Sequence, residues 1–204
     1  MPPITFKFAR GLDIPVTAAT AKFGLIGRSG SGKTYAAGKL VECLHDAGVQ
    51  VVVLDDIGNW WGLRVGAGGK GKGLDLVVFG GERGDLPITP DSGRLVAQLV
   101  VKHRLSAVLD ISDFRKSQAQ RFATDFAEEL FHLKKRHKSP LHLVIEEAHT
   151  FIPERTSKGT ERMKGAFQDI ARKGRNYNYM AILRKLQLVE KRGYRAADHL
   201  FVDR

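Results

Sequence analysis

Apolar and polar residues alternate along this chain in blocks that predict strands and helices in turn. Continuous apolar runs, typical of strands buried on both faces, fall at residues 23–26, 49–54, 74–79, 107–111, 141–145 and 177–183, with a last apolar stretch at 200–202. Between them, apolar residues recur every three or four positions, as on the buried side of a helix. These stripes are Ala37, Leu40, Val41, Leu44; Leu95, Val96, Leu99, Val100; Ala119, Phe122, Ala123, Phe126, Ala127, Leu130, Phe131; and Met163, Ala166, Phe167, Ile170.

The alternation predicts an α/β fold, with a mostly parallel sheet flanked by helices in a single domain over residues 1–204. Residues 1–20 are a lead-in, and the glycine-rich residues 63–73 are expected to form a surface loop. Gly48 should end the first helix, and Asp91 is the expected cap of the second. The basic run at 134–138 needs no ligand, because cations stabilise a helix C-terminus.

One stretch carries a specific chemical signal. Its residues match G-x-x-x-x-G-K-[ST], the phosphate-binding loop, at every fixed position: Gly27, Arg28, Ser29, Gly30, Ser31, Gly32, Lys33 and Thr34. The glycines let backbone N–H groups turn toward phosphate oxygens, and the following helix directs its partial positive charge at the same anion. Lys33 should reach the β- and γ-phosphates of ATP, and the Thr34 hydroxyl should bind Mg²⁺. The alternative is an ordinary glycine-rich turn between a strand and a helix.

A second candidate site follows the apolar run at 141–145, where Glu146 and Glu147 come next. A P-loop ATPase needs one carboxylate to hold Mg²⁺, usually through water, and another to orient and deprotonate the attacking water. We assign Glu146 to the metal and Glu147 to the water. As an isolated pattern, two acids after a strand are often only a solvated strand end.

Composition sets outer limits on function. No run approaches the 18 apolar residues of a membrane span, and no secretory signal is visible at the N-terminus. A lone cysteine, Cys43, suits a reducing compartment, so we expect a cytoplasmic protein. The 33 basic and 22 acidic residues give a net charge of +11, which fits either a soluble basic protein or a polyanion partner such as nucleic acid.

The chain resembles the HerA/FtsK-type ATPases, and more narrowly the HerA-like DUF87 proteins. The resemblance rests on residues 27–34, on 51–56 with the Trp-Trp-Gly-Leu at 60–63, on Val-Ile-Glu-Glu-Ala-His at 144–149, and on Gly-Arg-Asn-Tyr at 174–177. It implies a RecA-like P-loop core in a homo-oligomeric, hexameric ring that hydrolyses ATP and moves double-stranded DNA, as a translocase or helicase-type motor. It leaves open whether a partner nuclease takes part.

The resemblance also implies an arginine that reaches the γ-phosphate bound by a neighbouring subunit. Arg175 is the first choice and Arg172 the second, although both could be an ordinary basic helix end. Two features depart from the family. Arg184 stands where the family has a phosphate-sensing glutamine, which predicts slow hydrolysis. The N-terminal barrel of full-length HerA proteins is missing, so we expect a minimal or truncated member.

Other classes fit less well. A small-molecule kinase would carry an arginine-bearing lid, a GTPase would carry an Asn-Lys-x-Asp element, and a two-domain helicase would need a second RecA-like half. None of these is recognisable in the sequence. The remaining alternative is a non-motor ATP-binding module with slow hydrolysis, whose nucleotide-bound state signals to a partner.

Overall fold

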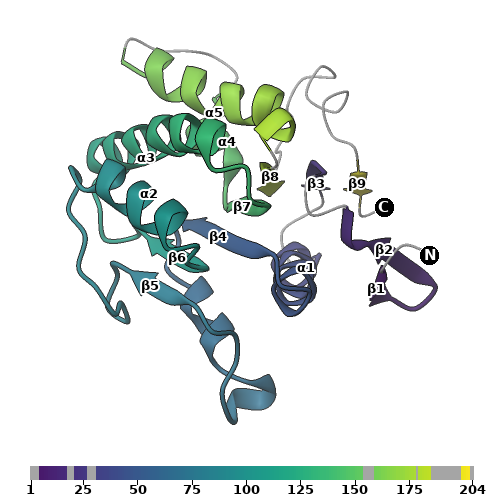
Figure 1. Ribbon diagram of the computed structural model, residues 1–204. Coiled ribbons are helices and arrows are strands. Elements are labelled where there is room, and N and C mark those ends of the chain that lie inside the picture. The colour runs from purple at the N-terminus through teal and green to yellow at the C-terminus, as the bar shows by residue number, and fades with distance from the viewer. Residues whose placement is uncertain are drawn as a thin grey trace.

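A parallel sheet forms the centre of the molecule (Figure 1). The computed structural model describes residues 5–17, 21–26, 31–153, 159–177, 179–184 and 199–202. The sheet has seven strands in the order β5-β6-β4-β7-β8-β3-β9, and each neighbouring pair is parallel. The strands are β3 (Phe23–Ile26), β4 (Gln50–Asp55), β5 (Val77–Phe79), β6 (Ala107–Asp110), β7 (Leu141–Ile145), β8 (Tyr179–Arg184) and β9 (His199–Val202).

Helices cover both faces of this sheet. Helices α2 (Gly93–Lys102), α3 (Lys116–Arg136) and α5 (Glu161–Lys173) pack on one face, together with Val52 and Leu54 of β4. Helix α1 (Lys33–Asp46) packs on the other face, against Val51 and Val53. Successive side chains of a strand point to opposite faces, so this division explains why β4 is apolar at consecutive positions. The predicted α/β fold, a mostly parallel sheet flanked by helices, is confirmed.

Several predicted elements appear where the pattern placed them. The stripe of α1 and the long stripe of α3 are buried, as is that of α5. Helix α1 ends at Asp46, and Gly48 follows with φ 78°, a left-handed conformation that favours glycine. The last apolar stretch forms β9, which pairs with β3 at one edge of the sheet.

The predicted stripe of α2 is confirmed at Val96 and Val100, which are buried, and is wrong at Leu95 because the helix is rotated. Leu95 is 57% exposed, whereas Ala97 and Val101 are buried. The cause is the close approach of α2 to α3 at Gly93, where a Cβ would lie 2.4 Å from the Phe122 carbonyl oxygen. Gly93 must therefore face α3, and the residues one and two turns later face it too.

The helix cap predicted at Asp91 is also wrong. Ser92 occupies the N-cap position of α2, and the Asp91 carboxylate lies 2.6 Å from the Arg121 guanidinium instead. Strand β5 begins at Val77 rather than at residue 74. The reason is that the Leu74 N–H donates to the Leu63 carbonyl, 2.8 Å away, and so belongs to the preceding loop.

Two segments outside the sheet contain structure that the pattern did not predict. The lead-in holds an antiparallel hairpin of β1 (Thr5–Ala9) and β2 (Leu12–Pro15), and Ile14 joins the core beside α1. Residues 63–73 extend a 3-10 segment, η2 (Trp60–Arg64), into a projection with a second 3-10 turn, η3 (Ala67–Gly69). A bridge between Val65 and Lys72 closes this projection.

Candidate active site

The start of α1 holds the described part of the predicted phosphate loop. Gly27, Arg28, Ser29 and Gly30 lie outside the described residues, whereas Ser31 to Thr34 are described. Gly32 is the N-cap residue, with φ 84° and ψ 11°, and its carbonyl accepts the first helical bond from Ala36 at 2.9 Å. A Cβ at Gly32 would meet nothing within 4 Å, so backbone conformation rather than space requires glycine here.

Lys33 and Thr34 begin this 14-residue helix. The Lys33 ammonium donates to the Ser31 hydroxyl at 3.5 Å, so it lies back over the loop that precedes it. Thr34 is exposed and lines a cavity of about 290 Å³ between α1 and η2. Gly38 and Trp60 line the same cavity. The helix start and the segment after β4 therefore face each other across a small hollow.

The loop after β4 is anchored by Asp55, which is fully buried. Its carboxylate accepts three backbone N–H bonds, from Ile57 at 3.0 Å, Gly58 at 2.9 Å and Trp60 at 2.8 Å. A carboxylate with three such donors is already solvated by the protein. Asp55 therefore has a structural role, which is to fix the path of the chain into η2.

Glu146 is tied to this loop. The residue is fully buried, its N–H donates to the Leu54 carbonyl at 3.2 Å, and its Oε2 accepts a hydrogen bond from the Trp60 indole. The Trp60 side chain is itself 4% exposed. The carboxylate at the end of β7 is thus held by a residue that comes 86 positions earlier in the chain.

Glu147 has a strained backbone. Its φ of 40° and ψ of 54° lie in the left-handed region, and it caps the short helix α4 (Ala148–Phe151). For a residue with a Cβ this conformation costs about 1–2 kcal/mol, and such strain concentrates at functional sites. Its Oε2 lies 3.2 Å from His149 Nδ1, and its side chain is 12% exposed. The two acids thus differ: Glu146 is fully buried, whereas Glu147 is mostly buried and has a backbone conformation that the fold must impose.

Asp56 is a further carboxylate close to Glu147 and Asp55, and we predicted no role for it from the sequence. Burial, and to a smaller extent the nearby Glu147 and Asp55 carboxylates, raise the pKa of its carboxyl to about 6. Hydrogen bonds from its own backbone N–H and from the Thr150 side chain act in the opposite direction. The available signal was a pair of acids directly after a buried strand, the pattern that singled out Glu146 and Glu147.

Strand β8 lies between the strands that lead to the two candidate sites. Leu25 of β3 pairs with Arg184, and Ile145 of β7 pairs with Leu183. The backbone of Arg184 therefore stands at the carboxyl edge of the sheet, between the phosphate loop and the acidic pair. This is the edge at which ligands bind in open α/β sheets.

The predicted arginines at 172 and 175 lie at the opposite edge. Arg172 is exposed near the end of α5, and Arg175 follows in the 3-10 segment η4 (Gly174–Tyr177), directly before β8 begins. Six strand residues span roughly 20 Å. The structure thus brings Lys33, Thr34, Glu146 and Glu147 to one edge and does not bring Arg172 or Arg175 to them.

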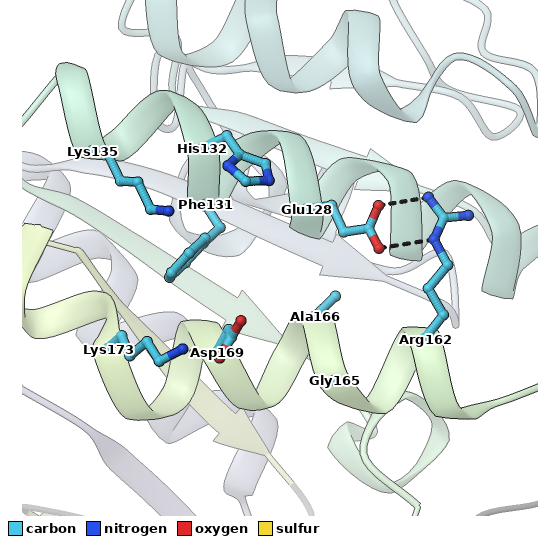
Figure 2. A pocket seen from close by; sticks show the side chains of 9 residues that line it. All are labelled: Glu128, Phe131, His132, Lys135, Arg162, Gly165, Ala166, Asp169 and Lys173. Atoms are coloured by element: carbon cyan, nitrogen blue, oxygen red, sulfur yellow. Dashed lines mark hydrogen bonds and ion pairs between the residues drawn. The ribbon is translucent and has the colours of Figure 1, made fainter.

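A larger hollow, of about 660 Å³, lies between α3 and α5 and includes none of these residues. Figure 2 shows its two ends. At one end Arg162 donates to the Glu128 carboxylate, and at the other the Lys135 and Lys173 ammoniums lie 4.6 and 5.9 Å from the Phe131 ring centroid. Lys173 also pairs with Asp169 at 2.8 Å. Much of the charge that lines this hollow is neutralised within it.

Within the described part of the chain, no helix is long and apolar enough to cross a membrane. Among the same residues, no group of three His, Cys, Asp or Glu side chains gathers closely enough to hold a metal ion without other ligands.

Residues 11–198 match a family model described as "Helicase HerA, central domain" (DUF87). No curated protein matches the chain in sequence. Among solved structures, the fold is similar to the genome packaging NTPase B204 from Sulfolobus turreted icosahedral virus 2 in complex with ATP-gammaS. The TM-score is 0.55 at 15% identity, over 91% of this chain and 76% of that one. It is also similar to the monomer form of the pCW3 conjugation coupling protein TcpA with ATPgS, with a TM-score of 0.51 at 12% identity, over 95% of this chain and 51% of that one.

Proposed function

This chain belongs to the HerA central-domain family, and from that premise we propose that it is an ATPase subunit that couples ATP hydrolysis to movement of double-stranded DNA. The observation that carries the proposal is the arrangement at the carboxyl edge of the sheet. There the start of α1, with Lys33 and Thr34, shares an edge with a buried carboxylate and a strained, partly exposed one. The genome packaging NTPase B204, whose fold is similar, binds ATP-gammaS in its solved structure, which agrees with this proposal.

In this proposal the backbone of residues 27–34 and the start of α1 bind the phosphates of ATP. Lys33 moves from the Ser31 hydroxyl, 3.5 Å away, to the β- and γ-phosphates. Thr34 and Glu146 would hold Mg²⁺, Thr34 directly and Glu146 through a water. When bound, this ion neutralises negative charge on the phosphates. The residues fit it, because Mg²⁺ in nucleotide sites takes one or two protein ligands and completes its shell with phosphates and water.

Glu147 orients the attacking water and accepts its proton. Its side chain is 12% exposed, and its buried Oε2 lies 3.2 Å from His149 Nδ1. The ring of His149 is 45% exposed and borders solvent beside this carboxylate. The backbone conformation of Glu147 restricts the orientation of its side chain, and a general base needs a defined orientation to act on one water molecule. We expect Glu147→Gln to bind ATP and leave it uncleaved.

Arg175, or Arg172 as the second choice, completes the site of a neighbouring subunit. Their position at the amino edge, roughly 20 Å of strand away from their own chain's acids, supports a role in trans. Such a role requires a ring, and a hexamer is the assembly we propose. Mixing Arg175→Ala subunits with wild type should lower ATPase activity more than dilution alone. A linear decrease would contradict the role in trans.

The distribution of positive charge supports DNA as the polyanion. Helices α2, α3 and α5 all end at the amino edge of the sheet, and each ends in basic residues. The exposed basic residues at these helix ends, or within two residues of them, are Lys102, Arg104, Lys135, Arg136, Lys138, Arg172 and Lys173. Burial, and to a smaller extent the nearby Arg104 guanidinium, lower the pKa of the buried Lys134 to about 8, so Lys134 and Arg104 repel each other. A phosphate backbone would relieve that repulsion.

The decisive experiment measures ATPase turnover with and without duplex DNA, alongside DNA affinity at several salt concentrations. Roughly five phosphate contacts would lower the affinity by two to three decades between 50 and 200 mM salt. Duplexes of equal length and different sequence should bind alike. Reversing charge at Arg136 and Lys138 should weaken binding more than the same reversal at Lys70 and Lys72, which lie on the projection. Salt-insensitive or absent DNA binding, with ATPase unchanged by DNA, would reject the motor.

One observation favours a second function, a non-motor module with slow hydrolysis. Arg184 stands at the tip of β8, between the phosphate loop and the acids, where a fixed cation can anchor phosphate without orienting water. Arg184→Gln should speed hydrolysis in either case. A chain that binds ATP, hydrolyses it slowly and ignores DNA would fit the module.

A further inference from the structure

Trp60 joins the loop after β4 to the acid at the end of β7. Its backbone N–H donates to Asp55 Oδ2 at 2.8 Å, and its indole N–H donates to Glu146 Oε2. Both carboxylates are fully buried. The same tryptophan lines the cavity on whose other side Thr34 stands. One residue therefore contacts the acid assigned to Mg²⁺ and borders the cavity that the Mg²⁺-binding threonine also lines.

An indole is suited to fix such a carboxylate. It offers one donor, accepts nothing and does not titrate, so its own hydrogen-bonding capacity does not change with pH. The donor is also held independently of its acceptor. Three backbone N–H bonds to Asp55 set the path of the loop, and the last of them is that of Trp60 itself. A hydrogen bond to an ionised acceptor inside a protein is among the stronger ones, and it restricts where the second oxygen can point.

We propose that Trp60 is a positioning residue that holds the Glu146 carboxylate in the orientation needed for Mg²⁺ bound with ATP. The inference rests on the proposed ATPase function. It also gives the indole a role as reporter, because a change at Thr34 or Glu146 alters the surroundings of the ring. The competing role is plain core packing, since Trp60 is 4% exposed and belongs to the core beside α1.

The neighbouring residue supplies a matched control. Trp61 lies in the same 3-10 segment and is half-buried, but its ring faces the Arg83 guanidinium, which lies 4.2 Å from the ring centroid. The chain contains two tryptophans, so replacing one leaves the other as the sole tryptophan. Trp60→Phe removes the indole donor and keeps an aromatic ring, and Trp61→Phe makes the same change one position away.

The first measurement is ATPase kinetics across Mg²⁺ concentrations. Loss of a partner that orients a metal ligand typically costs about 10–100-fold in metal affinity or activity. Trp60→Phe should therefore lower kcat and raise the Mg²⁺ concentration for half-maximal rate, with little change in KM for ATP, because Lys33 is untouched. Trp61→Phe should behave as wild type. Equal kinetics in the two variants would show that Trp60 only packs.

The second measurement needs no turnover and keeps Trp60. In a Trp61→Phe, Glu147→Gln protein, Trp60 is the only tryptophan, and its emission is recorded with ATP in EDTA and then with ATP and Mg²⁺. We expect a clear change that requires Mg²⁺, and no such change for the sole Trp61 of a Trp60→Phe, Glu147→Gln protein. An emission that ignores Mg²⁺ would overturn the inference. If the wild type fails to hydrolyse ATP but Trp60 responds to Mg²⁺, the proposed ATPase fails and the positioning role stands.

Discussion

The strained backbone of Glu147 leads to a prediction whose sign is unusual. Glycine is normally less stable than alanine by about 0.5–1 kcal/mol inside a regular element, because it loses more conformational freedom on folding. At φ 40° and ψ 54° the Cβ itself is costly, by about 1–2 kcal/mol. The Glu147→Gly protein should therefore be more stable than Glu147→Ala, by about 1 kcal/mol. Both variants lose the carboxylate and its 3.2 Å contact with His149, so their difference isolates the backbone.

The assay is urea unfolding of the two variants at pH 7. A stability difference appears as a shift in the urea concentration at the unfolding midpoint, with no change in the slope m. In thermal unfolding, a difference of about 1 kcal/mol corresponds to roughly 2–4 °C in Tm for a chain of this size. Arg121, exposed in the middle of α3, is the control position, and there glycine should be less stable than alanine. If glycine is also the less stable residue at 147, the left-handed conformation is not present and the strain argument fails. Neither variant at 147 should hydrolyse ATP.

Three further predictions concern charged side chains. Lys33→Ala should remain folded but lose hydrolysis and most ATP affinity, and wild-type affinity in a folded variant would place the nucleotide elsewhere. The pKa of Asp56 is about 6 in the folded protein and 3.8 in the unfolded chain, so ionisation of Asp56 destabilises the fold. Between pH 4 and 7, the free energy of unfolding of the wild type should fall by up to about 3 kcal/mol relative to that of Asp56→Asn, as measured by urea unfolding. The pKa of Lys134 is about 8 in the folded protein and 10.5 in the unfolded chain, so between pH 8 and 10.5 the unfolded chain binds more protons than the folded protein. Wild type should therefore gain stability relative to Lys134→Met as the pH rises from 8 to 10, and parallel profiles would contradict this.

Helix and strand periodicity predicted most of the fold because these elements bury complete stripes. The seven apolar residues of α3 marked in the sequence are all buried, and the helix covers 116–136. For α2 the prediction was right at Val96 and Val100 but wrong at Leu95, because apolar residues occupy more than one side of the helix and the pattern alone leaves its rotation open. There the deciding contact is tertiary: Gly93 must face α3 because a Cβ would collide with the backbone at Phe122.

The candidate site was predictable in part for a similar reason. A phosphate loop and an acidic strand end are local signals, and parallel strands bring their carboxyl ends to one edge. Contacts between residues that are far apart in the sequence leave no such local signal. Trp60 and Glu146 are 86 residues apart, and nothing in either segment indicates that an indole donates to that carboxylate. The left-handed backbone of Glu147 is equally hidden, because glutamate rarely adopts it.

The two edges of the sheet carry opposite charge, and this separation constrains the mechanism. The carboxyl edge gathers Asp55, Asp56, Asp110, Glu146 and Glu147 in a chain whose net charge is +11. Hydrogen-bond donors neutralise part of that charge: backbone N–H groups at Asp55, the Ser112 backbone and hydroxyl at Asp110, and an indole at Glu146. An edge this acidic repels ATP unless cations offset it. Within one subunit these cations include Lys33, Arg184 at the tip of β8 and a bound Mg²⁺, and the start of α1 adds its partial positive charge. The basic helix ends lie at the other edge, away from their own site, and in the proposed mechanism they reach a neighbour's nucleotide or DNA. A single subunit can thus bind ATP, whereas efficient hydrolysis under the proposed mechanism requires assembly.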